Sequence, residues 1–526
     1  MIGPVIVIGF TTAIAMWLAW LFAHQPWIDL PASIAGPGMG AFMIVGAFLA
    51  GRFGGRRLGW LAGAMASLLA AMLNLLIMGS LVAESIDESA PAQGAQGLTP
   101  SASMTMLGFL GLSVVGGAIF GLISNVRENP LEPRPMTIWA SRFAAVAAVS
   151  VVPLLLLGGL VTSTGSGLAV PDWPGTYGAN MFLYPIALMA DPRIFLEHTH
   201  RLFGSLVGLT TISLAIFVWS TPDLRRRLDV PVSIAATVVI GLLLIVGLRR
   251  HTAGDLGGMA FGGVGVAVAL ASVAWFLGAL HLHRPAQAAA ALILMVSAQG
   301  VLGGTRVTEA NPMLGTIHGV LGQVYFASMV MFAAWLAPTA RALRAESAFS
   351  GRARNVAWAL LASLLVQLVL GAMYRHGSMA AEPQAWAGPA LHGHMGFSIV
   401  VMVLAVVLGF MMLARGAGPD AQSDDANRRR GAKVIGRFGW LVIAVVVFQF
   451  ALGWAAFAVV TGGERRVVPT AAELGDAPTV PLVTALVTFA HQANGALLLA
   501  AASASVVWCG LVTSPRREVV PRVVPA

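Results

Sequence analysis

Apolar runs long enough to cross a lipid bilayer follow one another along almost the whole chain, and this pattern restricts the fold more than any other feature. The 526 residues are 57% hydrophobic and only 10% charged, which is more apolar sequence than the core of a water-soluble domain requires. Each run has roughly 17–25 residues, the length that spans a bilayer core. We count fourteen, near residues 4–23, 36–51, 57–80, 104–124, 140–162, 197–219, 230–248, 258–280, 287–305, 316–337, 355–373, 392–414, 438–461 and 483–508. The chain is therefore predicted to be an all-α, polytopic membrane protein with about 14 transmembrane helices.

Basic residues alternate between the loops that join these runs. If the N-terminus is cytoplasmic, 23 of the 31 lysines and arginines fall in loops or a tail on the cytoplasmic side. Only Arg249-Arg250 argues against this orientation, which places both termini in the cytoplasm. The net charge of +9 is then explained by membrane orientation, so we expect membrane lipid and no nucleic acid as a partner. The single cysteine, Cys509, excludes an intrachain disulfide.

An internal repeat divides the chain from residue 140 onward. Three predicted spans carry a Q-x-x-L-G pattern, and a fourth, Leu154 to Gly158, keeps Leu-Gly but has leucine in place of the glutamine. Each of the four is followed by an outer loop and then by a helix with a histidine near its outer end. The three complete patterns are Gln299 to Gly303, Gln367 to Gly371 and Gln449 to Gly453, and the histidines are His200, His318, His394 and His491. We interpret the glycines as packing residues that let helices approach each other.

Two histidines in each half, on different helices and at a similar depth, form the arrangement that a bis-imidazole haem site in a four-helix bundle needs. A single membrane histidine is more often a helix–helix hydrogen bond, but four at equivalent positions favour ligation of haem iron. Zinc or copper is an alternative, although no cysteine accompanies the histidines. We therefore expect two pseudo-symmetric four-helix bundles that form a haem-binding core.

The other histidines lack these properties. His198 and His392 lie two residues before the proposed ligands, which is about 200° around a helix, so they should point elsewhere. For them we expect packing or a hydrogen bond to a loop. The remaining histidines have no repeat partner and are given no role: His24, His251, His281, His283 and His376.

Four regions follow from the repeat. Residues 1–135 form an N-terminal membrane extension of about four helices, without an evident function. Residues 136–340 are the first haem half, with a helical insertion near 230–280, and residues 341–512 are the second. Residues 513–526 are a cytoplasmic tail.

One stretch carries charge beside a proposed ligand: Glu197-His198-Thr199-His200-Arg201. Glu197 and His200 are three residues apart, so they lie on one helix face, about 5–6 Å apart at Cβ. The carboxylate could accept a proton or stabilise positive charge on a reacting group, or it could cap the helix or pair with Arg201. Arg201 could instead hold a haem propionate. The equivalent places in the second half hold Leu391 and Met395, so the charges are absent there.

The stretches Gly158 to Pro174 and Glu197 to Arg201 resemble the haem A synthase family, as do the His394 helix and Phe489-Ala490-His491-Gln492. The resemblance covers about residues 140–510. It implies oxidation of a ring methyl of haem O to a formyl group, which makes haem A for cytochrome oxidase. It also implies that His200 and His318 flank the substrate haem O, that His394 and His491 ligate a resident haem b, and that Glu197 is the essential acid.

The chain departs from the pattern of this family in three ways. The outer loops lack the cysteine pair of some members, and the insertion and residues 1–135 are unexpected. Two other functions are possible alternatives: a di-haem b electron-transfer or quinol-oxidising membrane protein, and a haem carrier. A pure electron carrier has no need of a carboxylate such as Glu197 in only one of its halves.

The resemblance implies a bacterial-type cytoplasmic membrane, with the haem sites toward the outer face. The expected partners are a haem O synthase, an electron acceptor and cytochrome oxidase assembly factors, with homo-oligomerisation as a further expectation.

Overall fold

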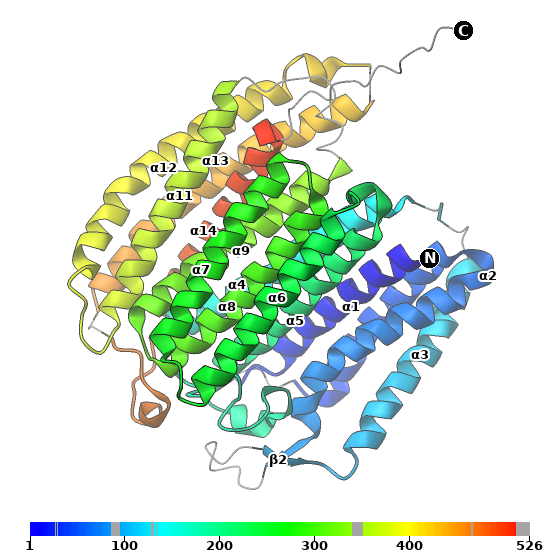
Figure 1. Ribbon diagram of the computed structural model, residues 1–526, viewed down its shortest axis with the longest axis horizontal. Helices are drawn as coiled ribbons and strands as arrows, with labels where there is room; N and C mark the ends of the chain where they lie inside the picture. Colours follow the sequence, from blue (N-terminus) through cyan, green and yellow to red (C-terminus); the bar gives the residue numbers. More distant parts are fainter. Residues whose placement is uncertain are drawn as a thin grey trace.

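A computed structural model shows a chain of long apolar helices (Figure 1). It describes residues 1–26, 28, 30–85, 95–127, 131–132, 134–338, 351–424, 426–463 and 466–511. Within these ranges thirteen helices are long and apolar enough to cross a membrane, which confirms an all-α, multi-pass membrane protein. They are α1 (Ile2–Ala23), α2 (Ala32–Val82), α3 (Ala102–Arg127), α4 (Met136–Thr164), α5 (Pro192–Ser220), α6 (Asp229–Thr252), α7 (Gly258–His281), α8 (Pro285–Thr308), α9 (Pro312–Leu336), α11 (Gly351–Ser378), α12 (Ala387–Gly416), α13 (Ala426–Thr461) and α14 (Leu482–Val506). The predicted tail, residues 513–526, lies outside the described residues.

Helix α2 accounts for the difference between fourteen predicted spans and thirteen helices. A straight helix of its 51 residues would be about 75 Å long, far more than a bilayer core of about 30 Å. At Gly55 the backbone leaves the helical region, with φ of +70°, a conformation that glycine adopts without strain. The two arms then fold back on each other, since a Cβ at Gly63 would lie 3.2 Å from the carbonyl oxygen of Ala47. These arms correspond to the predicted spans 36–51 and 57–80.

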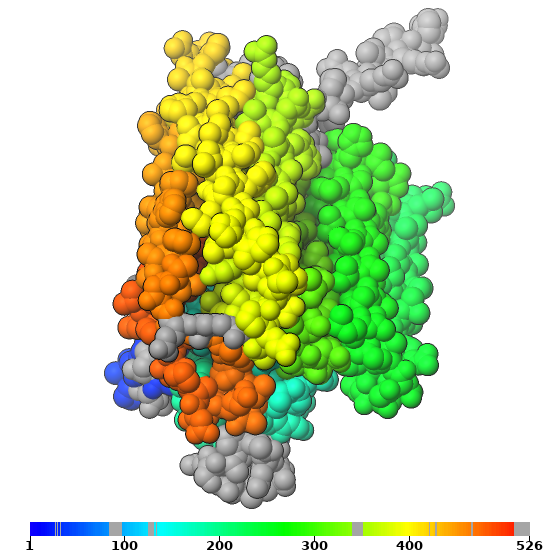
Figure 2. Space-filling model, turned by 90° about the vertical axis from the view of Figure 1, so that its left-hand side faces the viewer, coloured from blue at the N-terminus to red at the C-terminus, as the bar shows by residue number. Residues whose placement is uncertain are grey.

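Two groups of four helices form the centre of the molecule. In the first group α4 packs against α5 and α9, and α8 packs against α5 and α9. In the second, α11, α12, α13 and α14 form the same closed cycle. The groups meet where α4 and α9 contact α14 and where α9 contacts α11. In Figure 2 the yellow-green to orange helices of the second group lie side by side on the face toward the viewer.

The unexpected segments lie outside these two groups. Helices α6 and α7, the predicted insertion, pack mainly on α8, so α5 and α8 remain direct neighbours. Helix α1 packs on α4, and its Trp17 and Trp20 contact Phe203 and Phe195 of α5. Helices α2 and α3 continue away from this face (Figure 1). The insertion therefore does not interrupt the four-helix core.

Two helices that carry candidate ligands begin with strong caps. The side chain of Asp191 accepts a hydrogen bond from the Arg193 amide at 2.8 Å, at the start of α5. At the start of α9, Asn311 accepts from the amides of Met313 and Leu314 at 2.8 and 3.1 Å. Each cap is followed by proline at the first helical position, where its missing N–H costs nothing.

The loops predicted to share the outer side meet at one end of the bundle. Arg193 donates to the carbonyls of Leu474 and Ala477 at 2.5 and 3.3 Å, and the Val468 amide donates to the Met379 carbonyl at 3.2 Å. Two short antiparallel strands, β1 (Ala83–Ser85) and β2 (Ala95–Leu98), lie at the same end, β1 against the 3-10 turn η3 (Ile186–Met189). This end covers the part of the bundle where the candidate ligands lie.

Candidate functional site

Each of the four repeat histidines rests against a glycine of the preceding helix. That glycine is the last residue of the Leu-Gly pattern, and a Cβ at its position would crowd the imidazole. The distances from such a Cβ to histidine Cε1 are 3.0 Å for Gly158 and His200, 3.0 Å for Gly303 and His318, 2.9 Å for Gly371 and His394, and 3.4 Å for Gly453 and His491. The repeated glycine thus makes room for an imidazole, rather than for the backbone of a neighbouring helix as expected. We call these four positions the glycine notches.

A carbonyl one turn before each notch faces the same imidazole. In the second half, Nδ1 of His394 donates to the Gln367 carbonyl at 2.9 Å. The carbonyls at the equivalent positions face the other three rings, although those beside His200 and His318 fall short of hydrogen-bond geometry: Leu154 with His200, Gln299 with His318 and Gln449 with His491. A partner on Nδ1 fixes the ring and leaves Nε2 available for iron.

The second half fits a planar ligand between two imidazoles. The ring centroids of His394 and His491 are 6.1 Å apart. Two imidazoles on opposite sides of one metal, each with a metal–nitrogen bond of about 2 Å, have centroids about 6 Å apart. Gln449 lies beside this site: its Nε2 is 3.2 Å from Nδ1 and 3.5 Å from Nε2 of His491, and its Oε1 accepts from Asn494 at 2.8 Å. The donor set and spacing suit haem iron.

The first half repeats this construction with one imidazole from α5 and one from α9. His200 and His318 occupy the notches at Gly158 and Gly303, and the two rings are near enough to interact electrostatically. The fold thus brings the predicted ligands together within each half. Their role as ligands remains a prediction.

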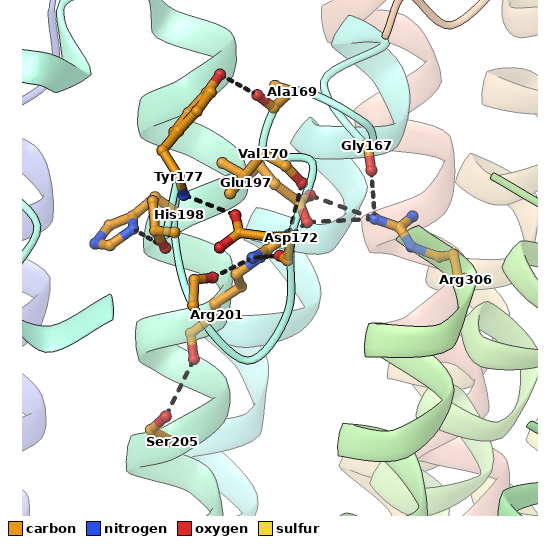
Figure 3. Close-up of polar contacts among 12 residues, drawn as sticks. Gly167, Ala169, Val170, Asp172, Tyr177, Glu197, His198, Arg201, Ser205 and Arg306 are labelled. Atoms are coloured by element: carbon orange, nitrogen blue, oxygen red, sulfur yellow. Dashed lines mark hydrogen bonds and ion pairs between the residues drawn. The ribbon is translucent and has the colours of Figure 1, made fainter. Parts of the chain in front are cut away.

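Charge is concentrated around Glu197, which precedes His200 by three residues in α5; Figure 3 shows Glu197 with Arg201 and Arg306. Glu197 is only 2% exposed, and its carboxylate lies between two guanidinium groups. Nε of Arg201 is 3.3 Å from Oε1, and Nη2 of Arg306 is 3.3 Å from Oε2 and 3.5 Å from Oε1. Arg306 lies at the end of α8, three residues beyond Gly303. Nothing in the sequence sets Arg306 apart from a loop arginine, because its link to Glu197 spans 109 residues.

Arg201 also holds the loop between α4 and α5. Its Nη1 donates to the carbonyls of Asp172 and Gly175 at 2.6 and 2.9 Å, and its Nη2 donates to Val170 at 2.9 Å. With the bond to Glu197, four of its five N–H groups have partners in the chain. The structure therefore shows Arg201 as a loop-holding residue, and the expected propionate contact has one free donor at most.

The loop itself has a fixed shape. Asp172 accepts from the amides of Tyr177 and Gly178 at 2.7 and 2.9 Å. The Tyr177 hydroxyl donates to the Ala169 carbonyl at 2.6 Å, and burial, with smaller effects from Asp191 and Asp172, raises the pKa of Tyr177 to about 12. On the far side Trp173 lies against Gly304, where a Cβ would overlap its ring. This loop covers the charged cluster.

Histidines outside the repeat differ in their surroundings. Nδ1 of His198, which is fully buried, is 3.1 Å from Oγ1 of Thr176, the loop hydrogen bond expected for it. His392 is exposed, and its Nδ1 pairs with the Gly388 carbonyl of its own helix at 2.9 Å. His376, which was given no role, lies against Gly315 of α9, so it extends from the second half to the helix that carries His318.

The second half has no counterpart of the charged cluster. With the notches superposed, Glu197 and Arg201 correspond to Leu391 and Met395, and Arg306 corresponds to Ala456. The three charged positions of the first site are thus occupied by apolar side chains in the second. The two sites share a pair of notched imidazoles and differ in the charged groups beside them.

Comparisons with known proteins point the same way. Residues 141–249 match the family model COX15-CtaA, described as a cytochrome oxidase assembly protein. This range contains Glu197, His200 and Arg201 but not the other three candidate ligands. The chain is similar to a heme A synthase of Shouchella clausii (strain KSM-K16), with 34% identity over 79 residues, which cover 15% of this chain and 25% of the relative. It is also similar to a heme A synthase of Alkalihalophilus pseudofirmus, with 32% identity over 101 residues, or 19% and 31% of the two chains.

These matches are partial. The chain spans between a quarter and a third of the length of the curated relatives that it matches. No solved structure matches the chain. The resemblance to the haem A synthase family is thus strongest around α4, the covering loop and α5.

Proposed function

We propose that this protein is a haem A synthase that oxidises a ring methyl of haem O to a formyl group. The observation that carries the proposal is the asymmetry between two otherwise equivalent sites. Both halves hold a pair of notched imidazoles, but only the first has a buried carboxylate between two arginines. An electron carrier or a haem carrier has no use for such a cluster at one of two sites, whereas an enzyme needs it at the site of reaction.

The two halves then have different tasks. His394 and His491 would ligate a resident haem b, which supplies electron transfer in an apolar setting that contains Leu391 and Met395. His200 and His318 would hold the substrate haem O. Conversion of the methyl to a formyl group with water as the source of oxygen releases four electrons and four protons. The electrons have to leave the first site for the acceptor, and the direct contacts of α9 with α11 and α14 bring the second site near it.

Glu197 is the chemical group of the first site. Its carboxylate lies between two guanidinium groups, so it can stabilise positive charge that develops on the reacting methyl and can accept a proton from it. The covering loop and its hydrogen bonds to Arg201 keep this carboxylate away from bulk water, which strengthens its electrostatic effect. The residues of this chain thereby bind the substrate, orient it and compensate its charge.

The same proposal includes location and partners. The protein would lie in a bacterial-type cytoplasmic membrane with both termini in the cytoplasm and the haem sites toward the outer face, surrounded by membrane lipid. It would receive haem O from a haem O synthase, pass electrons to an acceptor, and deliver haem A to cytochrome oxidase with the help of assembly factors. Homo-oligomerisation is part of this proposal.

The test is conversion of haem O by the purified full-length protein. The chain is co-expressed with a source of haem O, and the bound haems are identified by pyridine haemochrome spectra and HPLC. Accumulation of haem A is the expected result. Stoichiometric haem b together with unconverted haem O would refute the synthase and favour the di-haem carrier, and loss of all haem on purification would favour the haem carrier.

A further inference from the structure

Arg306 connects three parts of the first site that are distant in sequence. It lies on the last turn of α8, and its Nη2 contacts both oxygens of Glu197 on α5. The same nitrogen donates to the carbonyl of Gly167 in the covering loop at 2.9 Å. Figure 3 shows the guanidinium on the opposite side of the carboxylate from Arg201.

The two arginines restrain Glu197 differently. Arg201 contacts Oε1 alone and lies on the same helix, so by itself it leaves the carboxylate free to turn about its last bond. Arg306 contacts both oxygens through one nitrogen and from another helix, so the two arginines together hold the carboxylate from two sides. Because Arg306 lies one turn beyond Gly303, the notch of His318, it also ties the position of Glu197 to that of the second candidate ligand.

The covering loop is built to admit this arginine. A Cβ at Gly167 would lie 3.1 Å from Nη1 and 3.3 Å from Nη2 of Arg306, closer than a side chain ordinarily approaches. Glycine here lets the guanidinium reach both the Gly167 carbonyl and Glu197. The loop, the carboxylate and α8 are thus joined at one group.

We propose that Arg306 is the positioning residue of the first site: it sets the orientation of the Glu197 carboxylate beneath the covering loop. This inference rests on the proposed function, in which Glu197 acts on the substrate. Arg306 itself touches no reacting atom and acts through Glu197.

The test compares Arg306→Gln, Arg306→Lys and Gly167→Ala with the wild type in the full-length protein. Arg306→Gln should lower kcat for haem A formation about tenfold or more, the typical consequence of losing a buried charge-assisted hydrogen bond, with haem b content unchanged within about twofold. Arg306→Lys keeps the charge and should recover part of the rate. Gly167→Ala displaces the guanidinium by only a few tenths of an ångström and should give a smaller loss.

A matched control separates positioning from loop stability. Arg193 also fixes outer loops, through Leu474 and Ala477, but does not contact Glu197. Arg193→Gln should therefore leave kcat within about twofold of the wild type. An equal loss in Arg193→Gln and Arg306→Gln, or a wild-type kcat in Arg306→Gln, would overturn the proposal.

A readout independent of turnover keeps the two proposals distinguishable. The infrared difference spectrum between the wild type and Glu197→Gln isolates the carboxylate bands of Glu197, and these should shift in Arg306→Gln but not in Arg193→Gln. If the wild type converts no haem O, the proposed function fails and these bands still decide the role of Arg306. Unchanged bands in Arg306→Gln would exclude it as the positioning residue. Gly167→Ala provides the same measurement if Arg306→Gln does not fold.

Discussion

Adding one methyl group at Gly371 should displace haem b from the second site. The new Cβ would lie 2.9 Å from Cε1 of His394, and an ordinary carbon–carbon contact is about 3.5 Å, so the ring must move by about 0.6 Å. The hydrogen bond of Nδ1 to the Gln367 carbonyl at 2.9 Å resists that movement. Metal–ligand distances tolerate only about 0.2 Å. We therefore expect Gly371→Ala to weaken haem b binding about 10–100-fold, as perturbation of a ligand's supporting contacts does.

The matched control is the fourth notch. At Gly453 the added Cβ would lie 3.4 Å from Cε1 of His491, an ordinary contact, so Gly453→Ala should keep its haem b within about twofold. Both substitutions replace glycine in a helix by alanine, which favours the helix by about 1 kcal/mol. In Gly371→Ala the clash with His394 opposes this gain, so the melting temperature of each variant without haem is measured beside its haem content.

The assay measures haem b per protein from the pyridine haemochrome, during expression with limiting haem and after addition of excess haem. Loss of haem b in Gly371→Ala that excess haem partly restores is the expected result. Full haem b content in Gly371→Ala, or an equal loss in both variants, would refute the reasoning from the notch.

Three further predictions follow from the sites. Glu197→Gln should reduce haem A formation about 100-fold or more without changing the haem b spectrum, as measured by HPLC and absorption; full activity would exclude a chemical role for this carboxylate. His394→Ala and His491→Ala should each remove haem b from the purified protein, whereas retention of its reduced-minus-oxidised bands in either variant would contradict ligation. Tyr177 ionises near its ordinary pKa of 10 when unfolded and at about 12 when folded, so the stability it contributes should be lost as pH rises from 10 to 12. The melting temperature of Tyr177→Phe should fall less over that interval than the wild type's, and identical falls would show that the hydroxyl makes no such contribution.

The fold class was predictable because each membrane span is encoded locally. Length, apolarity and the distribution of arginine identify helices one at a time. Among the described helices, only the two arms of α2 are joined by a turn, at Gly55, without a loop between them. The repeat also predicted which histidines would share a half, since equivalent positions in equivalent helices must occupy equivalent places.

Contacts between distant segments were not predictable in this way. Arg306 resembles any loop arginine in sequence, and only the packing of α8 on α5 brings it to Glu197. The notches were only partly predictable. The Leu-Gly pattern is visible in the sequence, but the sequence does not show directly that a histidine packs against each of its glycines. A usable signal was present, because each such glycine is followed in the next helix by a histidine, and pairing the two repeats would have suggested contact.

The adjacent pair Gly158-Gly159 has a consequence for how this protein can change over evolution. Gly158 accommodates His200, while a Cβ at Gly159 would lie 3.4 Å from Phe489 and Gln492 of α14, the helix that carries His491. One turn of α4 therefore sets the position of one candidate ligand, His200, and the approach of the helix that carries another, His491. Charged residues of either half can change independently, but a larger residue at Gly158 or Gly159 would disturb both halves because these two glycines are adjacent.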